Sequence, residues 1–397
     1  MTTGKHRHIN VRRLLRTIHL WIGVSLGIPL ALIGATGSIL TYKHEIIALF
    51  DGASEPKLAT GAVKPVSQII DVARTQAPEG TQPMFLSIPG SDEPAIVRFA
   101  QPGRAAGPGA ATAVRIDPVS LTLFDAPERS TVQQWLRQAF QLHANLLGGR
   151  EGRFWVGWFG VAMCVLGVSG IVMWWPRPSR WRKAFGVSKG AHSIQFNREL
   201  HGAVGIWGLV VFLVISFSGA YIVFPQTTGE IVRTIFPGRD IRGEAASLRV
   251  TPVQDGTRMT ADEAVALARN IAPDEQLRII GFPLRPDQSY RVAFDLPGTT
   301  PGHGVPTITV FVDPWARSIV ATQDPRNYTV GETISVWQRA LHGGAGQGWL
   351  WQFLTFLSGL MPVLFAITGI TMWWKRRRHK KVHEAPQIRR KAASPAE

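Results

Sequence analysis

Four long apolar runs without a charged residue constrain this chain more than any other feature of its sequence. Each is about 22 to 25 residues long, which at about 1.5 Å per residue lets a helix cross a hydrocarbon core of about 30 Å. The runs are Thr17–Thr41, Phe154–Trp175, Ala203–Phe224 and Leu350–Trp374. With 45% hydrophobic and only 18% charged residues, the composition predicts an integral membrane protein and excludes an ordinary soluble enzyme.

The formal net charge of +16 is concentrated in three segments that flank these runs. Residues 1–16, 176–200 and 375–397 together hold 20 of the 43 Lys and Arg but only 3 of the 27 Asp and Glu. Cytoplasmic segments of membrane proteins carry such an excess, so a nucleic-acid partner is not needed to explain the charge. We expect a bacterial inner-membrane protein in the lipid bilayer, with both termini in the cytoplasm and two long segments in the periplasm.

The expected domains follow from this topology. The basic segments are an N-terminal tail (1–16), a loop (176–200) and a C-terminal tail (375–397), and the first span is an uncleaved anchor because it is too long for a signal peptide. Outside the membrane we expect two small α+β domains, 43–130 and 225–330, each with one helix on an antiparallel sheet. The segments 131–153 and 331–349 lead from these domains into the second and fourth spans.

Several kinds of cofactor site are missing from the sequence. Cys164 is the only cysteine, so an intrachain disulfide is impossible and Cys-ligated iron–sulfur clusters are excluded. No C-x-x-C-H motif for covalent haem occurs. The sequence also lacks G-x-G-x-x-G and Walker-type loops, so we expect no flavin or nucleotide site within this chain.

An internal repeat organises the chain. Leu142–Trp175 aligns without a gap with Leu341–Trp374; both begin with Leu-His and end with Ser/Thr-Gly-Ile-x-Met-Trp-Trp. The first and third runs match as well, because Arg16-x-x-His19-x-x-x-Gly23 aligns with Arg198-x-x-His201-x-x-x-Gly205. We therefore predict a mainly α membrane protein with four transmembrane helices from two parallel repeats.

Four of the eleven histidines occupy equivalent places in the repeat. His19 and His201 lie near the inner ends of the first and third runs, and His143 and His342 lie just before the second and fourth runs on the outer side. Ionisable residues in membrane helices are costly and usually functional. Two neutral imidazoles suit the iron of a b-type haem, although a single histidine at an interface is more often structural. The symmetry favours two haem sites at two depths.

The residues around these histidines fit the same interpretation. Glycines follow His19 and His201 along one helix face and leave a stripe on which a flat porphyrin can lie. Arg16, Arg198 and Arg339 each stand three residues before a repeat histidine, where a guanidinium can contact a haem propionate. Topology alone would also explain Arg16 and Arg198. His44 has no repeat partner and is expected at the surface, with replacement of an outer ligand as the alternative.

In this order the motifs resemble the PepSY-associated transmembrane proteins, an iron-regulated inner-membrane group that includes siderophore reductases. The resemblance implies periplasmic PepSY-like domains and two b haems, with His19, His201, His143 and His342 as the axial ligands of the haem iron. It further implies a haem-dependent ferric-siderophore reductase that carries electrons outward and releases ferrous iron in the periplasm. The electron donor must then be separate, either a cytosolic reductase or membrane quinol.

Two other functions are compatible with parts of the sequence. The chain could be a membrane-anchored PepSY-like binding or inhibitory module without redox activity, but an anchor does not account for four repeat-related histidines. Parallel repeats also occur in transporters. That function is disfavoured because we expect no run to be broken and because no acidic residue lies inside any run.

Overall fold

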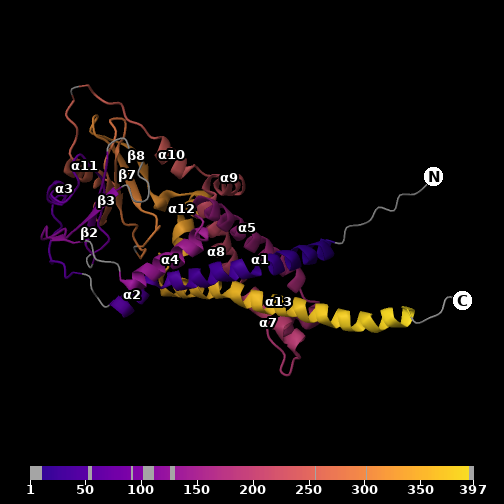
Figure 1. The fold of residues 1–397 in the computed structure, drawn as a ribbon. Helices are drawn as coiled ribbons and strands as arrows, with labels where there is room; N and C mark the ends of the chain where they lie inside the picture. Colours follow the sequence, from indigo (N-terminus) through magenta and orange to yellow (C-terminus); the bar gives the residue numbers. More distant parts are fainter. Residues whose placement is uncertain are drawn as a thin grey trace, which may run out of the picture.

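The protein consists of a helical bundle with an antiparallel sheet at one end (Figure 1). The structure is a computed structural model that describes residues 11–51, 56–90, 93–101, 111–125, 130–254, 256–300 and 302–392. The first residues of helix α1 and the last residues of helix α13 both lie at the end of the bundle that is far from the sheet. This arrangement agrees with the expectation that both basic tails lie on one side of the membrane and the sheet lies on the other.

Among the described residues, three helices are long and apolar enough to cross a membrane. They are α1 (Val11–Thr41), α5 (Gly149–Trp174) and the stretch Gly348–His379 of α13 (Gly348–Ala392). Helix α13 therefore continues well into the basic segment that we expected to be a separate tail. The first and last of these spans, in α1 and α13, contain the first and fourth apolar runs of the sequence.

The third apolar run is broken, and the expectation of an unbroken helix there is wrong. Helices α7 (Ser193–Trp207) and α8 (Leu209–Val223) meet at Gly208 with a bend of 71°, so the bundle has a fourth span only if this pair is counted as one. A Cβ atom at Gly208 would lie 2.5 Å from Met361 Sδ of α13. Hydropathy does not reveal the bend because the sequence is apolar on both sides of it.

Small residues let two pairs of helices approach closely. Helix α13 lies along α1, where a Cβ on Gly359 would be 2.7 Å from the carbonyl oxygen of Gly34. Helix α5 lies along α8, where a Cβ on Gly160 would be 3.1 Å from the carbonyl oxygen of Ser216. Gly160 aligns with Gly359 and Gly34 with Ser216 in the sequence. Two crossings of the same kind therefore occur at matching positions, as close packing of small residues in membranes requires.

Short helices connect these long ones. Helices α4 (Thr131–Asn145) and α12 (Val330–Gly343) precede α5 and α13, and each starts at a hydroxyl residue that accepts a backbone hydrogen bond, Ser130 and Thr329 respectively. Each ends at a residue in the left-handed conformation. Further short helices are α2 (Lys43–Asp51), η1 (Pro178–Arg180), α6 (Trp181–Ala184), α9 (Pro225–Ile235), α10 (Ile241–Ser247) and η2 (Pro325–Asn327).

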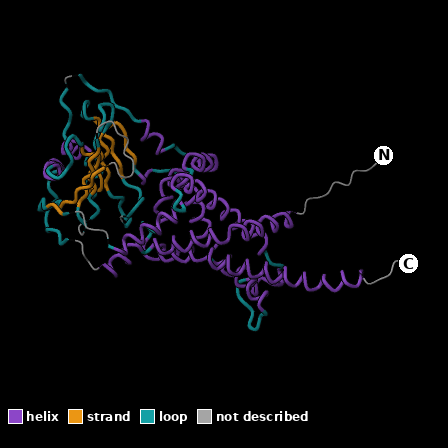
Figure 2. The backbone as a smooth tube through the Cα atoms, viewed as in Figure 1, coloured by secondary structure: helices purple, strands orange, loops and turns teal. Residues whose placement is uncertain are grey.

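The two outer segments build one sheet instead of the two separate domains that we expected. The strands are β1 (Gln82–Ser87), β2 (Ala95–Ala100), β3 (Ala111–Ile116), β4 (Leu123–Phe124), β5 (Leu277–Gly281), β6 (Tyr290–Phe294), β7 (Ile308–Asp313) and β8 (Ser318–Gln323). Their order is β4-β3-β2-β1-β5-β6-β7-β8, and every neighbouring pair is antiparallel. Figure 2 shows the strands gathered into one layer.

The seam between the halves explains why they join. Leu86 of β1 pairs with Ile280 of β5, and both side chains are fully buried. Unpaired, these two strands would be exposed edges with free backbone groups. Helices α3 (Val66–Arg74) and α11 (Ala261–Ala268) pack against each other and against the strands. The Asp262 carboxylate of α11 accepts a 2.6 Å hydrogen bond from the Val66 amide of α3, so the helices also tie the halves together.

Candidate cofactor sites in the helical bundle

The four repeat histidines meet in the two expected pairs. The ring centroids of His19 (α1) and His201 (α7) are 6.3 Å apart, with an angle of 64° between the ring planes. Those of His143 (α4) and His342 (α12) are 5.9 Å apart, with an angle of 41°. The outer pair thus comes from the two short helices that precede α5 and α13, and these helices lie against α1 and α8.

A hydroxyl group fixes each ring of the inner pair. His19 Nδ1 lies 2.8 Å from Ser169 Oγ, and His201 Nδ1 lies 2.8 Å from Thr368 Oγ1. Each hydroxyl already donates its single proton to a carbonyl of its own helix, at 2.6 Å for Ser169 and 2.7 Å for Thr368. The hydroxyls can therefore only accept from the histidines. In the neutral ring this places the proton on Nδ1 and leaves the Nε2 lone pair free to bind a metal ion.

Backbone carbonyls have the same effect on the outer pair. His143 Nδ1 lies 2.9 Å from the carbonyl oxygen of Ile33, and His342 Nδ1 lies 3.1 Å from that of Ile215. Ser218 Oγ is also 3.0 Å from His342 Nδ1, and Thr36 Oγ1 is 3.5 Å from His143 Nδ1. A carbonyl oxygen only accepts, so Nδ1 must be the donor here as well. All four rings leave Nε2 as their free nitrogen.

The supporting hydroxyls share a sequence pattern that we did not interpret as functional. Each precedes a glycine, in Thr36-Gly37, Ser169-Gly170, Ser218-Gly219 and Thr368-Gly369. In the outer pair the glycine makes room for the ring, because a Cβ at Gly37 would lie 2.8 Å from His143 Cε1 and one at Gly219 would lie 3.0 Å from His342 Cε1. In the inner pair the corresponding distances, from Gly170 to His19 and from Gly369 to His201, would be 3.8 and 3.9 Å, which are ordinary contacts. The repeat alignment already shows this pattern, because the Ser/Thr-Gly pair recurs at matching positions in the two halves.

The spacing of each pair fits a metal ion held between two imidazole nitrogens. With metal–nitrogen bonds of about 2.0 Å, an ion between two imidazoles lies about 3 Å from each ring centre, so the centroids should be about 6 Å apart. Both pairs match this spacing. Two glycines that follow the inner histidines leave open space, as a flat group would need. A Cβ on Gly23 would meet nothing within 4 Å, and one on Gly205 only Phe365 at 3.9 Å. Within the described residues no group of three or more His, Cys, Asp or Glu is placed to hold a metal ion.

The other residues proposed for the sites lie differently. Arg16 and Arg198 are exposed one turn before His19 and His201. Arg339 lies one turn before His342, and the pKa of its guanidinium is lowered by burial and by the nearby Arg242 and Arg153. His44 is exposed on α2 and belongs to neither pair.

The length and apolar composition of the helices indicate a multi-pass membrane protein, with an antiparallel sheet domain at one end of the helical bundle. The chain belongs to the family defined by the PepSY-associated TM region, whose profile matches residues 16–376. It is similar to the uncharacterized protein PA4219 of Pseudomonas aeruginosa, with 25% identity over 268 residues. That similarity covers 59% of this chain and 62% of the length of the relative.

Proposed function

We propose that the protein is an inner-membrane electron-transfer protein that holds two b-type haems and reduces ferric chelates, siderophores among them, on the periplasmic side. One haem belongs between His19 and His201 and the other between His143 and His342. The observation that carries the proposal is the close approach of two histidine rings in each of two pairs, all four with Nδ1 hydrogen-bonded. When bound, each haem iron would take up and give up one electron.

The residues of the chain would prepare the sites for this role. Ser169 and Thr368 hold the inner rings in one tautomer, and the carbonyl oxygens of Ile33 and Ile215 hold the outer rings. Two parallel repeats, with α7 and α8 together as a fourth span, would account for the matching positions of these supports. By the positive-inside rule, the basic segments favour a topology in which the far end of the bundle would face the cytoplasm and the sheet would face the periplasm.

The proposed topology also gives each side of the membrane a role. The inner pair would receive electrons from a separate donor, a cytosolic reductase or membrane quinol. The outer pair lies on α4 and α12, at the end of the bundle nearer the sheet (Figure 1). Chelators with hard oxygen ligands bind ferrous iron more weakly than ferric iron because of its lower charge density, so reduction would release the metal.

An absorption spectrum of detergent-purified protein tests the proposal. Oxidised and dithionite-reduced samples, with haem quantified as the pyridine complex, should give about two b haems per chain. A ferric chelate added to the reduced protein should reoxidise them. Protein that is folded but free of haem, purified from haem-replete cells, would overturn the proposal and favour an anchored binding module.

A further inference from the structure

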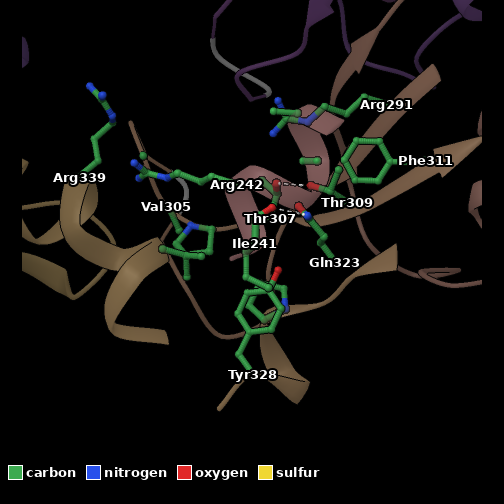
Figure 3. Close-up of a pocket in the computed structure, with 16 residues that line it drawn as sticks. Ile241, Arg242, Arg291, Val305, Thr307, Thr309, Phe311, Gln323, Tyr328 and Arg339 are labelled. Atoms are coloured by element: carbon green, nitrogen blue, oxygen red, sulfur yellow. Dashed lines mark hydrogen bonds between the residues drawn. The ribbon is translucent and has the colours of Figure 1, made fainter. Parts of the chain in front are cut away.

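A cavity of about 590 Å³ lies between the outer sheet and helices α10 and α12. Figure 3 shows its polar side chains, which come from α10, α12, strands β6 to β8 and their connections. They are Arg242, Arg291, Thr307, Thr309, Gln323, Tyr328 and Arg339. The lining contains three guanidinium groups and no Asp or Glu. Its size is in the usual range for small-molecule sites.

Several arginines of the sheet domain have a carboxylate partner. Arg239, Arg278 and Arg326 each form an ion pair with a carboxylate. Arg242, Arg291 and Arg339 form no ion pair among the described residues. Burial and the nearby Arg242 guanidinium both lower the pKa of Arg339, so these two cations repel each other, and an anion is the partner that would relieve this repulsion.

The charges are held in place by the surrounding structure. The Arg242 guanidinium lies 5.6 Å from the centre of the Tyr221 ring. Gly304 has φ +81°, and a Cβ there would lie 2.5 Å from Arg339 Cγ, so the loop closes directly on the stem of Arg339. The Arg291 side chain is exposed at the cavity, but the part of it that is buried is enough to lower the pKa of its guanidinium.

The cavity and the outer histidine pair share helix α12. Arg339 is three residues before His342 on α12, which places the two side chains about one helical turn apart on neighbouring faces. A molecule bound against Arg339 would therefore lie close to the outer pair and on the side of the sheet.

We propose that this cavity binds the electron acceptor, and that the acceptor is an anionic ferric chelate whose iron is held by carboxylate groups. The inference rests on the proposed function, because it names the substrate class of that reaction. In the step, one electron would reduce the chelated ferric ion to the ferrous ion, and a reduced haem held by His143 and His342 would supply that electron. The protein forms no bond to the chelated iron. The arginines pair with outward-facing carboxylate oxygens.

Binding of redox-inert gallium chelates to the full-length protein in detergent tests the proposal without requiring electron transfer. Gallium citrate, which is anionic, should bind at least about 10-fold more tightly than an uncharged gallium hydroxamate, and added salt should weaken its binding. Equal affinity for the two chelates would overturn the proposal. Equally tight binding of metal-free citrate would overturn the assignment of a metal chelate as the ligand.

Substitutions then locate the site. The double variant Arg242→Gln, Arg291→Gln should bind gallium citrate at least about 10-fold more weakly, and Arg242→Lys, Arg291→Lys should recover much of the loss because the charge returns. Arg98→Gln is the matched control, since Arg98 is exposed on β2, the strand that corresponds to β6 in the other half of the sheet. Unchanged binding in the double glutamine variant, with a melting curve like that of wild type, would overturn the proposal.

Haem content measured on the same preparations separates the two hypotheses. Failure of the proposed function would appear as missing haem in wild-type protein. Failure of this inference would appear as identical gallium citrate binding in wild type and the double glutamine variant, with haem present in both.

Discussion

Ser169 and His19 meet across two helices, with Oγ and Nδ1 2.8 Å apart although the residues are 150 positions apart in the chain. Because Ser169 donates its proton to the Val165 carbonyl, it acts toward His19 purely as an acceptor. Thr368 and His201 repeat this relationship at the matching positions of the second half. The hydroxyl therefore determines which ring nitrogen remains available to bind a metal ion. The proximity of the two histidines alone would not determine this.

Loss of this acceptor should weaken haem binding without abolishing it. We expect Ser169→Ala to lower the affinity of the inner site for haem by about 10- to 100-fold, as is typical when the group that orients a ligating histidine is removed. Haem titration of the apoprotein measures the effect. Ser169→Thr keeps the hydroxyl and should bind haem like wild type.

Ser358→Ala is the control for this effect, because Ser358 is a buried hydroxyl of α13 that donates to the Thr355 carbonyl of its own helix. If Ser358→Ala loses haem as readily as Ser169→Ala, the loss reflects packing and the orienting role is refuted.

The histidine pairing itself predicts which variants behave alike. His19→Ala and His201→Ala should each remove the same haem, and His143→Ala and His342→Ala should each remove the other, because both rings of a pair are needed at about 6 Å spacing. Haem content should fall by about half in each single variant. Redox titration identifies the missing haem by its potential. Loss of different haems in His19→Ala and His201→Ala would contradict the pairing.

Packing between α1 and α13 should be sensitive to a single methyl group. In Gly359→Ala the new Cβ would lie 2.7 Å from the Gly34 carbonyl oxygen, so the helices must separate. We expect a loss of about 1–3 kcal/mol in stability, measured as a lower melting temperature in detergent. Gly23→Ala adds a methyl group where nothing lies within 4 Å, and haem-free protein with this substitution should melt like wild type. Equal destabilisation by both substitutions would disprove the close contact.

Acid should weaken the outer domain through Glu332. This carboxylate is 3% exposed; burial raises its pKa, but hydrogen bonds from the Arg239 and Thr329 amides and from the Arg239 guanidinium outweigh burial and lower the pKa below its ordinary 4.5. A lowered pKa contributes stability that is present above pH 4.5 and is lost as the pH falls through the folded-state value. Thermal melts between pH 3 and pH 7 should show this loss.

Glu332→Gln is the informative variant because glutamine preserves the capping box of α12 but has no charge. It should be less stable than wild type at pH 7 by about 1–3 kcal/mol, and the difference should shrink below pH 4.5. A constant difference across this range would show that the charge of Glu332 does not contribute.

The repeat made much of the bundle predictable from the sequence. Equal spacing in the two halves places His19 against His201 and His143 against His342, and the structure brings these rings together. The C-terminal ends of α1 and α5 lie within one residue of the ends of the predicted runs, whereas both helices begin five or six residues before them. Haem ligation by these residues stays a prediction.

Other features could not be read from the sequence because they depend on contacts between distant segments. The pairing of β1 with β5 joins residues almost two hundred positions apart, as in Leu86 and Ile280, and no local pattern specifies it. The bend at Gly208 lies within a uniformly apolar run and shows only in the packing against Met361. The arginine-lined cavity likewise depends on three elements that converge in space.

The seam between β1 and β5 limits how the outer domain can move. Besides the paired strands, the Ile88 amide donates to the Arg278 carbonyl and the Phe282 amide donates to the Met84 carbonyl, so backbone bonds continue beyond both ends of the ladder. A hinge between the halves would break this ladder and expose the core they share. The shared ladder and core therefore oppose a hinge motion between the two halves, and a ligand that approaches this domain meets one continuous, rigid sheet.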